Sequence, residues 1–162
     1  MKKIIVFCFP LFLFFQGCNS FFSNNTYALD IVGEKKVQAS RKGEIVKDNK
    51  VLVVATVTHL NEVSALTYRG REYFFVEFYS EDDIGNFVEY HLNKLKPLWV
   101  REITKDEFDE VLKPNNKWSK CYLVAFDSIG GIGAREMILG MDVVGFGIME
   151  FDFGFKTLPM QF

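Results

Sequence analysis

The chain has 162 residues, and the part that should form a folded domain contains two histidines and one cysteine. These are the side chains best suited to bind a soft metal or to act on a substrate. They are His59, His91 and Cys121. Three such ligands, with an open fourth position, are typical of catalytic zinc sites. No two of them stand at the short spacing that zinc motifs use. We therefore expect ordinary strand histidines and a buried free thiol, with no metal and no other cofactor.

The sequence also lacks the usual motifs of catalysis. Nucleophilic catalysis needs a serine or cysteine beside an oriented base, and neither histidine lies near a Gly-x-Ser-x-Gly turn. The glycine-rich stretch 130–133 is followed by Ala134 and Arg135 instead of the lysine and hydroxyl residue of a P-loop. The carboxylates at 81–83 are adjacent, whereas a calcium loop alternates them. We expect a non-catalytic protein, and a small enzyme that uses one of the histidines is the less favoured alternative.

The elements that would carry these side chains are strands. Apolar residues alternate with polar ones more often than they recur at helical spacing, and β-branched and aromatic types dominate. In the segment 50–60, Val53 and Val57 share a face with His59. Near the end of the chain, Met149 and Phe151 alternate with charged residues, which predicts a half-buried strand. The predicted strands include 50–60, 72–79, 87–92, 97–103 and 118–127, with one or two more within 135–155.

The connections complete the predicted fold. A polar segment with one glycine predicts a hairpin between 72–79 and 87–92. Thr104 and Glu107 fit a capping box, and an apolar stripe follows, so a helix is predicted from there to Pro114. Seven or eight short strands with one short helix predict an all-β fold, either an antiparallel β-sandwich or a small barrel, of which the sandwich is favoured.

Composition restricts the partners of this domain. Phenylalanine alone contributes 18 residues, so a packed core is expected, and any surplus of aromatic residues should form an exposed patch for a protein partner or a second copy of the chain. The net charge is −2. Removing Lys2 and Lys3 with a leader takes the 19 basic residues to 17 against 21 acidic ones, a net charge of −4. Nucleic acid is therefore not an expected partner, because a polyanion needs a basic surface.

The first 17 residues have the pattern of a signal peptide. Two lysines precede an apolar run, Ile4–Phe15, which ends shortly before Cys18. A transmembrane helix is the alternative, but it needs about 20 apolar residues, and Pro10 interrupts this shorter run. The sequence therefore predicts an exported protein.

The residues around Cys18 resemble the lipobox of bacterial lipoproteins. In that family the thiol receives a diacylglycerol, and a small residue such as Gly17 lets the peptidase cleave just before the cysteine; Phe15 and Gln16 differ from the preferred residues. The resemblance implies a signal peptide at 1–17, a lipidated tether at 18–28 and a sandwich domain at 29–162. Two or three acyl chains hold a protein stably on a membrane. No acidic residue follows Cys18 at once, which favours the outer membrane of a bacterial cell envelope.

A second resemblance concerns the domain itself. The strand containing Tyr122 and Val124 is similar to the Tyr-x-Cys-x-Ala strand of immunoglobulin domains, with Val124 in the cysteine position and Trp99 as the core tryptophan. With its leader, the chain resembles the small lipoproteins with a variant immunoglobulin-like fold found in Campylobacter and its relatives. The resemblance implies a lipoprotein that binds another protein, with surface adhesion as one form. The alternative is an accessory lipoprotein of a secretion or envelope-assembly machine.

Overall fold

The computed structural model describes residues 30–81, 87–130 and 136–154, and within these residues the chain forms eight antiparallel strands in two sheets. The larger sheet has the order β1-β2-β3-β6-β5, and the smaller sheet has the order β4-β7-β8. The strands are β1 (Ser40–Lys47), β2 (Lys50–His59), β3 (Arg71–Ser80), β4 (Val88–Leu92), β5 (Trp99–Ile103), β6 (Lys120–Asp127), β7 (Ile138–Val143) and β8 (Gly147–Asp152). The predicted all-β sandwich of seven or eight strands is confirmed. Its immunoglobulin-like character stays a prediction.

The predictions for the start of the chain lie outside the described residues. These are the signal peptide at 1–17, the tether at 18–28 and the lipidation of Cys18. Most of the carboxylate run at 81–83, most of the glycine-rich stretch and Phe155 also lie outside them.

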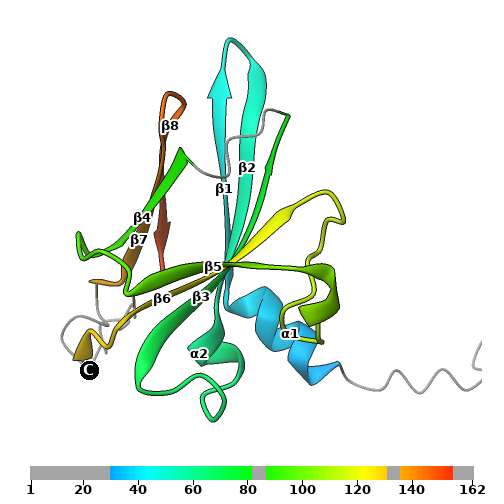
Figure 1. The fold of residues 1–162 in the computed structure, drawn as a ribbon, viewed down its shortest axis with the longest axis vertical. Coiled ribbons are helices and arrows are strands. Elements are labelled where there is room, and N and C mark those ends of the chain that lie inside the picture. The colour runs from blue at the N-terminus through cyan, green and yellow to red at the C-terminus, as the bar shows by residue number, and fades with distance from the viewer. Residues whose placement is uncertain (1–29, 82–86, 131–135, 155–162) are drawn as a thin grey trace, which may run out of the picture. The chain divides into compact units, whose positions relative to one another are not determined.

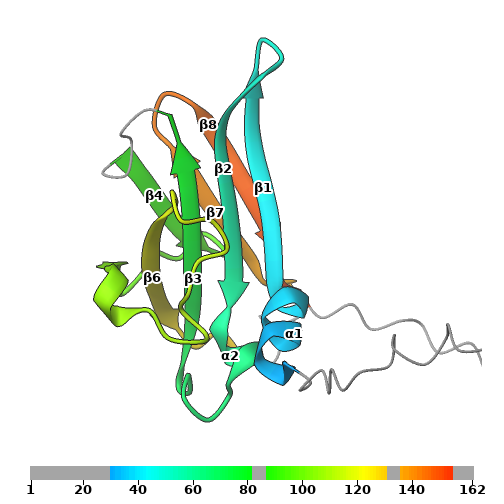
Figure 2. The same cartoon turned by 90° about the vertical axis from the view of Figure 1, so that its right-hand side faces the viewer.

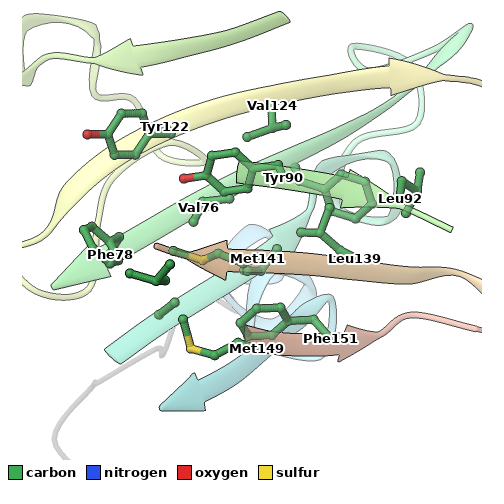
Figure 3. Packing of buried hydrophobic residues seen from close by; sticks show 14 of the residues in the cluster. Val76, Phe78, Tyr90, Leu92, Tyr122, Val124, Leu139, Met141, Met149 and Phe151 are labelled. Atoms are coloured by element: carbon green, nitrogen blue, oxygen red, sulfur yellow. The ribbon is translucent and has the colours of Figure 1, made fainter. Parts of the chain in front are cut away.

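The two sheets pack face to face on one apolar core (Figures 1 and 2). Alternation along the strands supplies this core, because every second side chain of a strand points to the same face. In β2 the inward residues Val53, Ala55 and Val57 are fully buried, as the sequence predicts. The smaller sheet contributes Leu139, Met141 and Phe151 (Figure 3). We call the sheet surfaces that meet here the inner faces.

The larger sheet begins with a hairpin that the sequence analysis did not predict. Strand β1 is mostly polar, and Ile45 is its one residue in the inner core, so it lacks the apolar alternation that identified the other strands. Its turn consists of Asp48 and Asn49, which have positive φ angles of 51° and 58°. Two consecutive left-handed residues form the tight turn that suits a two-residue hairpin, and short polar side chains tolerate that conformation.

The predicted hairpin between 72–79 and 87–92 is wrong. Strands β3 and β4 form as predicted, but they belong to different sheets. Strand β3 pairs with β2 and β6, and β4 pairs with β7. The chain therefore crosses from one layer to the other after Ser80, since both strands must place an apolar face in the core between the sheets.

The predicted helix from Thr104 to Pro114 is wrong in its length and type, although the predicted capping box of Thr104 and Glu107 forms. Only a single 3₁₀ turn, η3 (Lys105–Glu107), forms there, with the Thr104 amide donating to the Glu107 carboxylate at 3.2 Å. Phe108 then adopts an extended backbone, and it packs with Val111 on the larger sheet. This apolar burial outweighs the helical tendency of the segment. Among the described residues the longest helix is α1 (Ile31–Gln38), and α2 (Leu60–Val63) follows β2.

The outer face of the larger sheet carries a second, smaller apolar cluster. It is built on Leu60, Phe75, Ile103, Cys121 and Leu123. Trp99 packs against this cluster, so it lies on the outer face and not between the sheets. The predicted role of Trp99 as a core tryptophan is therefore wrong, while Val124 lies in the inner core as expected.

Candidate functional site

The fold places the three residues with metal-binding or nucleophilic chemistry on three different surfaces. His59 lies on the inner face of the larger sheet, among the inward residues of β2. Cys121 lies on the outer face of that sheet. His91 lies on the outer face of the smaller sheet, because its neighbours Tyr90 and Leu92 point inward. The fold therefore does not assemble them into one metal site or catalytic group.

His59 is held between two carboxylates. Its Nδ1 lies 3.0 Å from Glu62 Oε1, and its Nε2 lies 3.0 Å from Glu72 Oε2. The ring stacks on Phe74 with a centroid distance of 4.9 Å. Burial alone would lower the pKa of His59, but the hydrogen bonds and charges of both glutamates outweigh burial and raise it above the usual value of 6.5. Because both ring nitrogens are engaged, His59 joins α2 to β3 and has no nitrogen left for a substrate.

His91 packs directly against the backbone of the neighbouring strand. It pairs with Gly140 of β7, and a Cβ atom at Gly140 would lie 1.9 Å from His91 Nε2. Only glycine leaves room for the ring in this position. Gly140 therefore marks a close contact between β4 and β7.

Cys121 lies beside a buried ion pair that the sequence analysis missed. Lys36 Nζ of α1 lies 4.0 Å from Glu77 Oε1 of β3, and both side chains are nearly inaccessible to solvent. Burial raises the pKa of the Cys121 thiol to about 12. Cys121 is a buried free cysteine, as predicted, and at neutral pH it is protonated and a poor nucleophile.

The ion pair holds two separate segments on the outer face of the larger sheet. Lys36 Nζ donates to the Lys113 carbonyl, and Glu77 accepts from the Asn115 amide at 2.6 Å and from its side-chain Nδ2 at 3.1 Å. Burial lowers the pKa of Lys36, and burial raises the pKa of Glu77 despite these hydrogen bonds. The pair therefore fastens α1 and the segment after η3 to β3. No apolar periodicity marks such a contact in the sequence.

One lateral side of the sandwich is closed where β1 lies alongside β8 (Figure 2). We call this the closed side. Arg41 Nε donates to the Asp152 carbonyl at 3.1 Å, and the Arg41 guanidinium lies over the Phe153 ring at 5.4 Å from its centroid. The groove that remains has a volume of about 470 Å³ and is lined by Arg41, Lys42, Glu150, Phe151, Asp152 and Gly154.

The opposite side is open, because the larger sheet has five strands and the smaller sheet three. The cross-strand pair of Val100 with Val124 places Val100 on the inner face, yet Val100 is 42% exposed while Val124 is fully buried. Leu98, whose amide donates to Ala125, precedes Val100 by two residues on the same face and is 44% exposed. The smaller sheet therefore leaves the inner face of β5 uncovered.

Strand β4 adds an unpaired edge beside this uncovered face. The Phe87 carbonyl accepts from Val144, and the Asn93 amide donates to Ile138, so the odd-numbered residues of β4 direct their backbone groups toward β7. The even-numbered residues therefore face the other way. Leu92 is paired there with Leu95, and within the described residues no strand pairs with Val88 and Tyr90.

The side chain of Tyr90 carries the one buried hydroxyl without a partner in the described part of the chain. Tyr90 is 7% exposed, and its hydroxyl makes no hydrogen bond to the described residues. Burial raises the pKa of Tyr90, with a smaller contribution from Tyr122 on β6. Figure 3 shows both tyrosines with their hydroxyls directed toward the same side of the interior. An unsatisfied buried hydroxyl costs about 1–3 kcal/mol and calls for an explanation.

We define the open side as Leu98, Val100 and Glu102 of the β5 face together with Val88 and Tyr90 of the β4 edge. Exposed aromatic and apolar residues border it at both ends. Phe87, at the start of β4, is 58% exposed, and Leu95, which pairs with Leu92 at the other end of the strand, is also exposed. The sequence predicts that any aromatic surplus forms an exposed patch, and this stays a prediction, because Phe87 is the one exposed aromatic residue among those named at the open side.

No known protein family, curated protein or solved structure matches the chain. Among the helices of the described residues, none is both long and apolar enough to cross a bilayer.

Proposed function

We propose that the chain is a non-catalytic lipoprotein of the bacterial envelope that binds another protein through the open side of its sandwich. Cys18 carries the lipid and anchors the domain to the outer membrane. The observation that carries the binding role is the apolar face of β5, uncovered beside the unpaired edge of β4. Uncovered apolar surface next to an open strand edge is a typical protein-binding feature.

The environments of the chemically capable residues favour binding over catalysis. Both nitrogens of His59 are hydrogen-bonded to carboxylates, and His91 fills the space above Gly140. The Cys121 thiol is buried and has a raised pKa. Each side chain therefore has a structural role that accounts for it.

Metabolic labelling tests the anchor. Cells that express the full chain are fed a fatty-acid probe, and Cys18→Ala is compared with Cys8→Ala, a matched cysteine within the leader. We expect the wild-type chain and Cys8→Ala to be labelled and to fractionate with the outer membrane, and Cys18→Ala to be unlabelled. Equal labelling of Cys18→Ala would contradict the anchor.

Site-specific photo-crosslinking tests the binding role in intact cells. A photoreactive residue replaces Val100 on the open side, and Ile148, which is 62% exposed on β8, serves as the matched control position. We expect one discrete adduct from position 100 and none from position 148. Adducts of equal yield at both positions would argue against a specific partner at the open side.

Protease treatment of intact cells separates the two forms of the function. Digestion of the domain on intact cells is expected of a surface adhesin. Protection in intact cells, with digestion only after the outer membrane is opened, favours the accessory component of a secretion or assembly machine.

A further inference from the structure

We propose that the open side takes up an extended segment of the partner protein, which pairs with β4 as a fourth strand of the smaller sheet. This inference rests on the proposed function, because it names how the partner binds and what the partner must present. Three features of the open side determine the chemistry of that segment.

The backbone of β4 determines that the segment is extended. Val88 and Tyr90 direct their amide and carbonyl groups away from β7, and no strand of the described residues pairs with them. An added strand satisfies such groups through main-chain hydrogen bonds, whatever its side chains. Pairing with Val88 and Tyr90 needs only about three residues, so a free segment can run past both ends of this short edge.

The inner face of β5 determines the side chains of the segment. A strand beside β4 would lie over β5, so every second side chain would point toward Leu98 and Val100. Apolar residues at these alternate positions would cover the exposed face. A serine, threonine or amide side chain among them can accept a hydrogen bond from the Tyr90 hydroxyl, which has no partner in the described residues.

Charges at the two ends determine the flanking residues. Lys94 and Lys96 are exposed at the turn that follows β4, and Glu102 is exposed at the other end of the β5 face. An acidic residue at one end of the segment and a basic residue at the other complement these charges. The expected partner segment is therefore short, extended and alternately apolar, with ends of opposite charge.

A second copy of the chain is the other occupant to be tested. Two copies would have to pair β4 with β4. Each edge offers only Val88 and Tyr90 for this pairing, because the backbone groups of Leu92 are already hydrogen-bonded to Leu95. So short a ladder favours a free segment over a dimer.

The experiment uses a synthetic fluorescent peptide, Asp-Val-Thr-Ser-Thr-Val-Lys, whose valine, serine and valine at alternate positions face the domain, and the full chain purified in detergent. Binding is followed by fluorescence anisotropy, and hydrogen exchange of the 87–91 region is measured with and without peptide. The matched control peptide has the same sequence with N-methyl groups on the amides that face β4. Loss of two main-chain hydrogen bonds should weaken its binding about tenfold or more.

Protein variants locate the site. Val100→Asp should weaken peptide binding by about tenfold or more, because it places a charge against the apolar residues of the strand. Ile148→Asp, a matched exposed position on β8, should bind as the wild-type chain does. Tyr90→Phe should bind more weakly than wild type while remaining folded. Slower exchange at 87–91 in the complex would place the peptide at β4.

Three results would overturn the inference. The first is equal binding of the N-methylated peptide, and the second is no saturable binding of the unmodified peptide at millimolar concentration. The third is a stable dimer that Val100→Asp dissociates, which would assign the open side to a second copy. The proposed function is tested by separate experiments. It is contradicted if the wild-type chain is not labelled by the fatty-acid probe, or if position 100 gives no crosslinked adduct.

Discussion

The two lateral sides of the sandwich differ in how far the apolar inner face of the larger sheet is covered. On the closed side, β1 and β8 approach each other, Arg41 bonds to the Asp152 carbonyl, and the Phe151 ring is buried. On the open side, β5 has no strand of the smaller sheet over it, and Val100 is exposed. The difference indicates that the closed side provides stability, and the exposure of the open side is the basis for the proposal that it binds a partner.

Truncation of one apolar side chain on each side should give the largest difference in the free energy of unfolding. Phe151→Ala removes a ring that is buried between the sheets, so it should lower the free energy of unfolding by about 3–5 kcal/mol. Val100→Ala removes a half-exposed side chain, and its effect should be roughly 0.5 kcal/mol. Urea denaturation of the two variants checks this. Similar losses would mean that the open side is part of the stabilising core.

A smaller effect is expected from a single added methyl group on the closed side. A Cβ atom at Gly43 would lie 2.9 Å from the edge of the Phe151 ring, so Gly43→Ala should destabilise the domain by about 1–3 kcal/mol. Phe151→Leu in the same chain frees part of this space. The double variant should therefore be more stable than the sum of the single variants implies, and strict additivity would place the two residues out of contact.

The closed side and the open side also differ in how far the sequence could predict them. Alternation identified the inward residues of β2 and β8, and it correctly gave a sandwich, because burial of one face imposes a period of two on the sequence. It missed β1, whose polar sequence forms a strand by pairing with β2. It also placed β3 and β4 in one hairpin, since local pattern does not say which sheet a strand joins.

The candidate site could not be predicted from the sequence, because its features depend on how the strands are arranged in the two sheets. An apolar residue such as Leu98 or Val100 gives the same sequence pattern whether or not a strand covers it. Its exposure depends on how many strands each sheet has. The ion pair of Lys36 and Glu77 joins residues about forty positions apart. Neither feature repeats along the chain, so neither has a period that sequence analysis can detect.

The stability of the closed side should depend on pH through His59. Its ring lies 5.8 Å from the Phe153 ring, which also contacts the Arg41 guanidinium. Because the pKa of His59 is raised in the folded state, its contribution is fully present below the unfolded value of 6.5 and is lost as pH rises through the folded pKa. The unfolding free energy of wild type minus that of His59→Gln should therefore shrink from pH 6 to pH 8.

Denaturation at several pH values measures this difference. His91→Gln is the matched control, since within the described residues His91 forms no ion pair with a carboxylate, and it lies on the outer face of the smaller sheet. A difference for His59→Gln that stays constant or grows with pH would contradict the assignment of the imidazolium between Glu62 and Glu72.

The smallest expected effect lies on the open side and has the opposite sign. Tyr90→Phe removes a buried hydroxyl that has no partner within the described residues, so it should stabilise the isolated domain by about 1 kcal/mol. Tyr79→Phe, at an exposed position on β3, should change stability by less than about 0.5 kcal/mol. If Tyr90→Phe also weakens binding of the strand peptide, the same hydroxyl destabilises the free domain and stabilises the complex. Destabilisation by Tyr90→Phe would instead show that the hydroxyl is already satisfied in the free domain, and the closed and open sides would then differ in coverage alone.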